Sequence, residues 1–301
     1  MTLNIQPFPY QGSKRKTADQ ILEKISVKPK RIIEPFAGSA ALTIAAASKQ
    51  LCGNFLINDS YEPLMKLWTL IVNKPSVVIN GYTELWNAQI KDPKAFYLEI
   101  RKQFNKDNDP IKLIYLMNRA VKGAIRFNSH GEFNQSADNR RLGKKPGRLM
   151  KDINTISLLL KNKAIISCAD YSCVLKNLKK GDLVYMDPPY LGTSSGKDHR
   201  YHQNLNLERF IQNLEFLNER QINYMVSFDG KTGDKAYGNG LPESLGLKKI
   251  NVNGGISAQG TLNVKHVYTT ESLYISSGLQ IYKEDESLFN IRAINYGRSF
   301  N

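Results

Sequence analysis

The tetrapeptide Asp187-Pro188-Pro189-Tyr190 combines the residue types with the most specific chemistry in the chain. It follows the apolar run 182–186, which is typical of a buried strand, and two prolines would end that strand and stiffen the chain. The Asp carboxylate and a rigid backbone carbonyl can then accept both hydrogens of an exocyclic amino group, while the aromatic ring stacks on the base that carries it. This arrangement aims the nitrogen lone pair at an electrophile. We therefore predict that these four residues are catalytic.

Acidic residues also follow three other apolar runs, at the position where ligands bind in open α/β sheets. Glu34 leads into a turn of small residues, in which Gly38 would let a ligand approach the backbone closely. Asp59 lies about 20 residues beyond this glycine, where a carboxylate can hold a ribose diol. Asp170 follows the next run. Tight turns and helix N-caps use the same residue types, so the residues alone leave both interpretations open.

The elements that would position these acids alternate between short apolar runs and amphipathic stretches. This alternation predicts an α/β fold with a mostly parallel, doubly wound sheet. Strands are expected at 31–34, 54–58, 163–167, 182–186 and 223–227. Helices are expected at about 40–49, 61–72, 171–178 and 206–220. Two stretches rich in β-branched residues predict an antiparallel C-terminal hairpin at one edge of the sheet, at 248–252 and 267–276. Polar or glycine-rich loops are expected at 192–204 and 229–240.

The segment 75–161 interrupts this alternation and also differs from the rest of the chain in charge. The 301 residues include 42 Lys and Arg and 27 Asp and Glu, for a net charge of +15. Residues 91–151 contribute +9 of that excess, from fifteen basic and six acidic residues. Such clustering indicates a polyanionic partner, most often nucleic acid, although charge alone also fits a merely basic protein. We predict a catalytic domain formed by 1–74 and 162–301. A mainly helical insertion, which its charge makes a candidate for nucleic-acid binding, would occupy 75–161, with a hairpin near 124–140.

Several classes of protein do not fit the sequence. No run approaches 18 uncharged apolar residues, and no apolar segment of a secretory signal precedes the first basic cluster. The three cysteines have neither zinc-site nor disulfide-framework spacing, so we expect a reduced cytoplasmic protein without a metal. The single glycine of the first turn does not make the three-glycine fingerprint of a nicotinamide-dependent oxidoreductase.

The order of these motifs resembles that of the Dam-type N6-adenine DNA methyltransferases of class alpha. In this family the cofactor region, the target-recognition segment and the catalytic motif follow one another along the chain. The resemblance covers most of the sequence and rests on a set of short strings: Pro9-Tyr10-Gln11-Gly12-Ser13-Lys14, Glu34-Pro35-Phe36-Ala37-Gly38-Ser39, Leu56-Ile57-Asn58-Asp59, Asn118-Arg119, Arg126-Phe127-Asn128, Gly131-Glu132-Phe133-Asn134, Asp187-Pro188-Pro189-Tyr190, Tyr201-His202 and Val226-Ser227-Phe228-Asp229.

The resemblance implies a Rossmann-like methyltransferase that transfers a methyl group from S-adenosylmethionine to an adenine flipped out of double-stranded DNA. Lys14 would lie near the cofactor carboxylate, Asp59 would bind the ribose and Asp170 would lie close to the cofactor adenine. Tyr190 would stack on the flipped base. The full set of implied cofactor contacts is Tyr10, Lys14, Glu34, Phe36, Gly38, Asp59, Asp170 and Asp187. DNA contacts are expected from Arg119, Lys122, Arg126, Asn128, Asn134, Arg140, Arg141, Lys144, Lys145 and Tyr201.

The recognition segment departs from the family pattern, because the stretch 119–126 lacks the aromatic residues common in Dam relatives. The recognition sequence is therefore not carried over, and Arg126 is expected to contact either a base edge or a phosphate. An N4-cytosine methyltransferase and a non-catalytic basic nucleic-acid-binding protein on the same fold remain alternatives. A cytosine C5 enzyme would need a Pro-Cys nucleophile pair, which the chain lacks. We expect a monomer, acting either alone or with a cognate restriction endonuclease.

Overall fold

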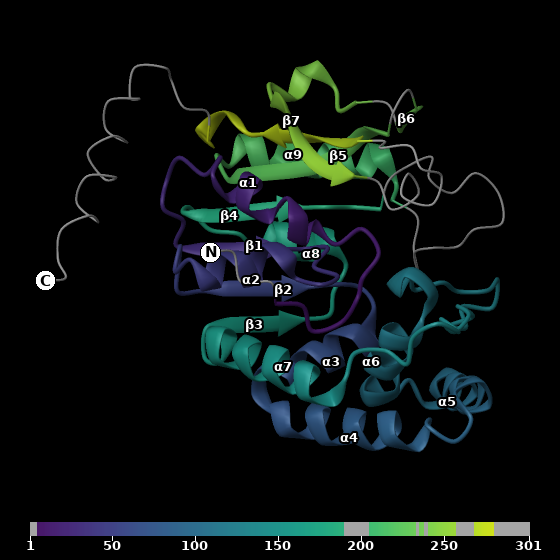
Figure 1. The fold of residues 1–301 in the computed structure, drawn as a ribbon. Helices are drawn as coiled ribbons and strands as arrows, with labels where there is room; N and C mark the ends of the chain where they lie inside the picture. The colour runs from purple at the N-terminus through teal and green to yellow at the C-terminus, as the bar shows by residue number, and fades with distance from the viewer. Residues whose placement is uncertain (1–4, 190–204, 233–234, 238–239, 257–267, 280–301) are drawn as a thin grey trace, which may run out of the picture.

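The computed structural model describes residues 5–189, 205–232, 235–237, 240–256 and 268–279. One mixed sheet runs through it in the order β3-β2-β1-β4-β5-β8-β7, with β6 paired to β5 (Figure 1). The first five strands on this path are parallel to one another. Their bounds are β3 Ala164–Ser167, β2 Phe55–Asn58, β1 Arg31–Glu34, β4 Asp182–Met186 and β5 Asn223–Thr232. The strand order reverses between β1 and β4, so the carboxyl ends of these two strands form the topological switch point where ligands bind in such sheets.

The far edge of the sheet is antiparallel, as predicted. β8 (Tyr268–Ile275) pairs with both β5 and β7 (Lys248–Ile256). The loop predicted at 229–240 is wrong, because β5 continues to Thr232 and β6 occupies Lys235–Tyr237. Hydrogen-bonding partners on β8 and β6 extend β5 past Asp229 despite the local glycines. Such pairing with a distant strand leaves no local sequence signal.

Side chains of the central strands alternate between two hydrophobic clusters, one on each face of the sheet. Ile32 belongs to the cluster that contains α1 (Ala18–Leu22), α2 (Ala41–Ser48) and α3 (Glu62–Asn73). Ile33 belongs to the cluster that contains α8 (Tyr171–Lys176) and α9 (Leu207–Glu219). This period of two, with both faces buried, accounts for the continuous apolar runs of the parallel strands. Short 3-10 helices complete the fold at Lys14–Lys16 (η1), Val121–Gly123 (η2), Glu243–Leu245 (η3) and Ser277–Leu279 (η5).

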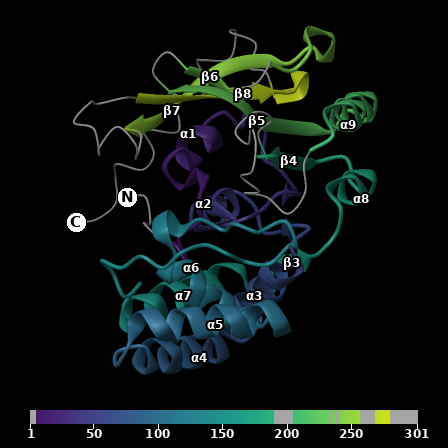
Figure 2. The ribbon, with the colours of Figure 1, turned by 90° about the vertical axis from the view of Figure 1, so that its right-hand side faces the viewer.

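The segment 75–161 is mainly helical, as predicted, and its helices lie together beyond β3 (Figures 1 and 2). They are α4 (Pro75–Ala88), α5 (Pro93–Asp107), α6 (Pro110–Arg119) and α7 (Pro146–Leu160). Each begins with proline in its first turn, where the missing N–H would have no intrahelical partner. Two isolated antiparallel bridges, Ala120–Ala137 and Phe127–Phe133, mark the predicted hairpin. The hydrophobic core is continuous with that of α3, so this part of the chain packs on the sheet domain directly.

None of the helices in the described ranges combines the length and apolar character that a membrane crossing requires. Within the same ranges, no three His, Cys, Asp or Glu side chains are grouped so that they could hold a metal ion.

Candidate active site

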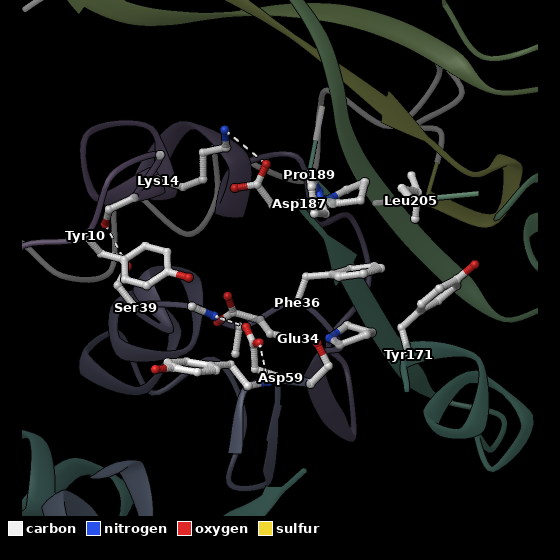
Figure 3. A pocket seen from close by; sticks show the side chains of 18 of the residues that line it. Tyr10, Lys14, Glu34, Phe36, Ser39, Asp59, Tyr171, Asp187, Pro189 and Leu205 are labelled. Atoms are coloured by element: carbon white, nitrogen blue, oxygen red, sulfur yellow. Dashed lines mark hydrogen bonds and ion pairs between the residues drawn. The ribbon is translucent and has the colours of Figure 1, made fainter. Parts of the chain in front are cut away.

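A pocket opens at the carboxyl ends of β1, β2 and β4 (Figure 3). Every residue predicted to contact the cofactor lines it: Tyr10, Lys14, Glu34, Phe36, Gly38, Asp59, Asp170 and Asp187. Pro188 and Pro189 of the catalytic tetrapeptide line it as well. Tyr190 and Tyr201 lie outside the described residues. The parallel sheet therefore brings together, from distant segments of the chain, the residues that were selected by type and spacing.

The turn after β1 requires glycine at position 38. Gly38 has φ +48°, and a Cβ atom there would lie 2.7 Å from Cε1 of Tyr10. The turn is fixed from both sides, because Gly38 N–H donates to Asp59 Oδ2 at 3.0 Å and Trp68 Nε1 donates to the Gly38 carbonyl at 2.9 Å. A side chain at this position would therefore clash with the Tyr10 ring, which packs against the turn. Trp68 was missed in the sequence because it appears there only as a core residue of α3.

Glu34 supports the start of α2 from below the turn. The residue at the N-cap of α2 is Ala40, in a left-handed conformation and without a capping side chain. Instead, Glu34 Oε1 accepts the N–H of Thr43 at 2.6 Å. Burial raises the pKa of the Glu34 carboxyl to about 7, and the negative charge of Asp187 adds to this shift. Glu34 thus has a capping role that the sequence did not indicate.

Asp59 and Asn58 join the ends of neighbouring strands. Asn58 Nδ2 donates to the carbonyls of Pro35 and Ala169, both at 3.0 Å, which ties β2 to the segments after β1 and β3. The Asp59 carboxylate accepts the N–H of Gly38 and, at 3.1 Å, that of Tyr61. Burial raises its pKa, while these backbone donors lower it. Asp59 therefore closes a turn and also lines the pocket, whereas the N-cap of α3 is Tyr61.

The opposite wall of the pocket is aromatic and contains an ion pair. The Phe36 and Tyr171 ring centroids are 4.9 Å apart. Asp170 caps α8 by accepting the N–H of Ser172 at 3.0 Å, and it pairs with Arg209 of α9, whose Nη2 lies 2.7 Å from Oδ1. Burial would raise the pKa of the Asp170 carboxyl, but the Ser172 hydrogen bonds and the Arg209 guanidinium hold it below its ordinary value. Arg209 lies within helix α9 and belongs to no motif, so the sequence did not single it out.

Lys14 lies between two carboxylates of the chain. Its Nζ is 3.1 Å from Asp187 Oδ1 and 3.3 Å from Glu271 Oε2, and the residue is only 6 % exposed (Figure 3 shows the pair with Asp187). The sequence comparison had placed this ammonium beside a cofactor carboxylate. Glu271 was missed, because in the sequence it is one polar residue of a β-branched stretch far from every motif.

The hairpin of the insertion forms part of the same pocket. Ile125 and Phe127 line it, and the Phe127 ring packs edge-on against Tyr61 at 5.3 Å between centroids. At the hairpin tip, Asn128 Oδ1 accepts the N–H groups of His130 and Glu132, both at 2.9 Å. The Asn128 side chain, predicted to contact DNA, is therefore used within the turn. A target base that enters beside the tetrapeptide would pass this hairpin.

Two of the predicted DNA contacts are wrong. Arg119 is 2 % exposed, and its guanidinium donates to the backbone carbonyls of Asp138, at 2.9 Å, and Arg141. Lys144 donates to the Gln6 carbonyl and pairs with Asp152 at 2.7 Å. Both charges are used inside the protein, where they hold the loop 138–145 and the N-terminal segment in place. Of the other predicted contacts in the insertion, the exposed ones are Asn134, Arg140, Arg141 and Lys145, Arg126 is half-buried, and Lys122 lies in η2.

Comparison with known proteins agrees with this arrangement. The family model of the D12 class N6 adenine-specific DNA methyltransferases matches residues 10–255. The Retron Ec67 DNA adenine methylase of Escherichia coli is 28% identical over 206 residues, 64% of this chain and 68% of that protein. The Type II methyltransferase M.MjaIII of Methanocaldococcus jannaschii is 26% identical over 294 residues, which cover 88% of this chain and 98% of that protein. The DNA adenine methylase of Escherichia coli K12 is 24% identical over 227 residues, which cover 72% of this chain and 78% of that protein. The chain therefore belongs to the D12 class of N6 adenine-specific DNA methyltransferases.

Proposed function

We propose that S-adenosylmethionine is the methyl donor and that the pocket at the β1–β4 switch point holds it. The observation that carries this proposal is the pocket lining around the Gly38 turn, where the backbone leaves no room for a side chain against the Tyr10 ring and the Asp59 carboxylate lies beside it. Asp59 suits the ribose hydroxyls, because its two oxygens accept the N–H groups of Gly38 and Tyr61 and a carboxylate has about four lone-pair sites. Phe36, Tyr171 and Asp170 suit the adenine of the cofactor, with rings for its faces and a carboxylate for its amino group.

The catalytic roles that we propose belong to the tetrapeptide after β4. Asp187 and the Pro188 carbonyl accept the hydrogens of the target N6, and Tyr190 stacks on the base. When bound, the cofactor supplies the methyl group from its sulfonium, which leaves as a neutral thioether with the electrons of the broken C–S bond. Asp187 takes up the proton that the methylated amine releases. Because no covalent link to the protein forms, positioning contributes much of the acceleration.

The target adenine is proposed to reach this pocket by leaving the DNA duplex, since N6 cannot meet a methyl donor inside the base stack. The hairpin that carries Ile125 and Phe127 already forms a wall of the pocket, which supports an approach from the insertion side. Arg126 is proposed to contact a base edge or a phosphate there. The exposed residues Asn134, Arg140, Arg141 and Lys145, together with Lys122 and Tyr201, are proposed to contact DNA.

The cellular setting is also a proposal. We propose that the protein acts on DNA in the cytoplasm, as a monomer. Relatives named as Type II methyltransferases support a role beside a cognate restriction endonuclease, and relatives named as DNA adenine methylases support a solitary role.

The cofactor proposal is tested by calorimetric titration of the purified protein with S-adenosylmethionine and, separately, with NAD. We expect saturable binding of S-adenosylmethionine and none of NAD. Binding of NAD alone would overturn the proposal. Gly53→Val is a suitable control variant for mutations in the pocket, because a Cβ atom at position 53 would meet nothing within 4 Å.

A further inference from the structure

Three charged side chains from three distant segments meet beside the catalytic tetrapeptide. Lys14 comes from η1, Asp187 follows β4, and Glu271 is on β8. The Lys14 ammonium is almost fully buried and lies within ion-pair distance of both carboxylates. Glu271 Oε2 is also buried and has no hydrogen-bond partner, so its partner in the described structure is this ammonium. Burying this ion pair costs free energy because both charges lose their contacts with water, so we expect the pair to have a role beyond stabilising the fold.

The formal charges of the group are unequal. Lys14 contributes +1, and Asp187 and Glu271 contribute −1 each, so the group carries −1. If only Lys14 and Asp187 were present, the group would be neutral. Glu34 adds little charge well below neutral pH, because burial raises the pKa of its carboxyl to about 7. Counted over these three described side chains, the charge of −1 beside the reacting atoms matches the +1 that moves from sulfur to the target nitrogen during methyl transfer.

We propose that Glu271 is a positioning residue of the methyl-transfer site, which holds Lys14 against Asp187 and gives the site the net negative charge that selects a sulfonium cofactor over its neutral thioether product. This proposal rests on S-adenosylmethionine being the cofactor. Lys14 orients the Asp187 carboxylate toward the target amine. Glu271 contacts the same Lys14 ammonium as Asp187 does. Its negative charge balances that ammonium, so the charge of Asp187 is left as the net charge of the group.

Sheet pairing shows why Glu271 can hold this position. Its backbone is paired on both sides, with Gly230 of β5 and Val252 of β7, so its Cα is fixed in the middle of the antiparallel part of the sheet. A glutamate at an exposed strand edge would not be held in this way.

The proposal is tested by comparing how variants bind S-adenosylmethionine and S-adenosylhomocysteine, measured by calorimetric titration. The two ligands differ in the sulfonium charge and the methyl group, so contacts with the rest of the cofactor cancel in the ratio of their affinities. Glu271→Gln should weaken binding of S-adenosylmethionine about tenfold and that of S-adenosylhomocysteine less than about twofold. It should also lower kcat while the KM for DNA stays unchanged.

Two further variants keep the test decisive if Glu271→Gln folds poorly. Lys14→Gln should shift the ratio in the opposite direction, toward S-adenosylmethionine, because it removes a positive charge from the same group. Glu271→Asp keeps the charge and should keep the ratio within about twofold of wild type. Glu219→Gln, at an exposed position at the end of α9, makes the same charge change away from the pocket and should alter neither affinity.

Equal weakening of both ligands in Glu271→Gln would show that Glu271 supports the fold only, and an unchanged ratio in both Glu271→Gln and Lys14→Gln would also overturn the proposal. Failure of the wild-type protein to bind S-adenosylmethionine would instead contradict the proposed cofactor. These outcomes separate the two claims.

Discussion

The edge of the sheet that forms the pocket and the helical insertion beside it place their charged residues by different rules. At the sheet edge, each acidic residue follows a strand, and parallel strands end at one side, so Glu34, Asp59 and Asp187 converge. In the insertion, the positive charges share only their sign. Some of them interact within the protein: Arg119 donates to a backbone carbonyl, and Lys144 pairs with a buried carboxylate. A strand period fixes where a side chain lies, whereas a local excess of charge does not.

The largest effect is expected from a side chain introduced at Gly38, in the turn after β1. Gly38→Val would place a branched side chain against the Tyr10 ring at a positive φ. We expect the affinity for S-adenosylmethionine to fall at least about a hundredfold, measured by titration. Gly53→Val should bind the cofactor as the wild type does. If Gly38→Val still bound the cofactor, the turn at Gly38 would not be part of the cofactor site.

The buried carboxyl at the sheet edge predicts a pH dependence of stability. Because the folded pKa of Glu34 is raised from 4.5 to about 7, its protonated form is favoured in the folded state. Its contribution is therefore fully present below about pH 4.5 and is lost as the pH rises through about 7. The free energy of unfolding of the wild type, relative to Glu34→Gln, should fall by about 3 kcal/mol between pH 4.5 and 8. Denaturant titrations at several pH values measure this difference, and a constant difference would contradict the buried capping role.

Arg119→Met tests whether this positive charge of the insertion stabilises the fold. The substitution removes a buried guanidinium that holds the carbonyls of Asp138 and Arg141, so we expect a loss of about 2–3 kcal/mol in the free energy of unfolding. Arg140→Gln, at an exposed position of the same loop, should change the unfolding free energy by less than about 0.5 kcal/mol. If Arg119→Met were as stable as the wild type, the internal role assigned to this residue would be wrong.

The smallest effect is expected at the exposed cations of the loop. Replacing Arg140, Arg141 and Lys145 together by Gln should weaken DNA binding across all sequences. If all three contact phosphates, the slope of log affinity against log salt should become shallower by about 2–3. Binding measured at several salt concentrations gives this slope. An unchanged slope would show that the loop faces solvent in the DNA complex.

Much of the fold could be predicted because its signals are local. Strands β1 to β4 and the helices that follow them lie within a residue or two of the expected positions, since buried parallel strands are continuous apolar runs between turn residues. The path after Asp229 was not predicted. There the conformation depends on pairing with β8, about forty residues later in the sequence.

The same distinction applies to the pocket. Motif residues such as Gly38 and Asp187 could be selected because the type of residue follows directly from its task. Trp68, Arg209 and Glu271 could not, because each lies on an ordinary helix or strand. Tertiary packing alone brings Arg209 to the pocket and brings Trp68 and Glu271 against residues that line it. Arg119 and Lys144 were misassigned for the converse reason: nothing local distinguishes a cation that binds DNA from one that binds the protein's own carbonyls.

The central claim is that this chain methylates adenine N6 through the carboxylate that follows β4. Methylation-aware sequencing of DNA from cells that express the wild type or Asp187→Ala tests it directly. We expect N6-methyladenine within one fixed sequence in cells that express the wild type and none in cells that express the variant, while purified Asp187→Ala still binds DNA. N4-methylcytosine in place of N6-methyladenine, or methylation that persists in the variant, would contradict it.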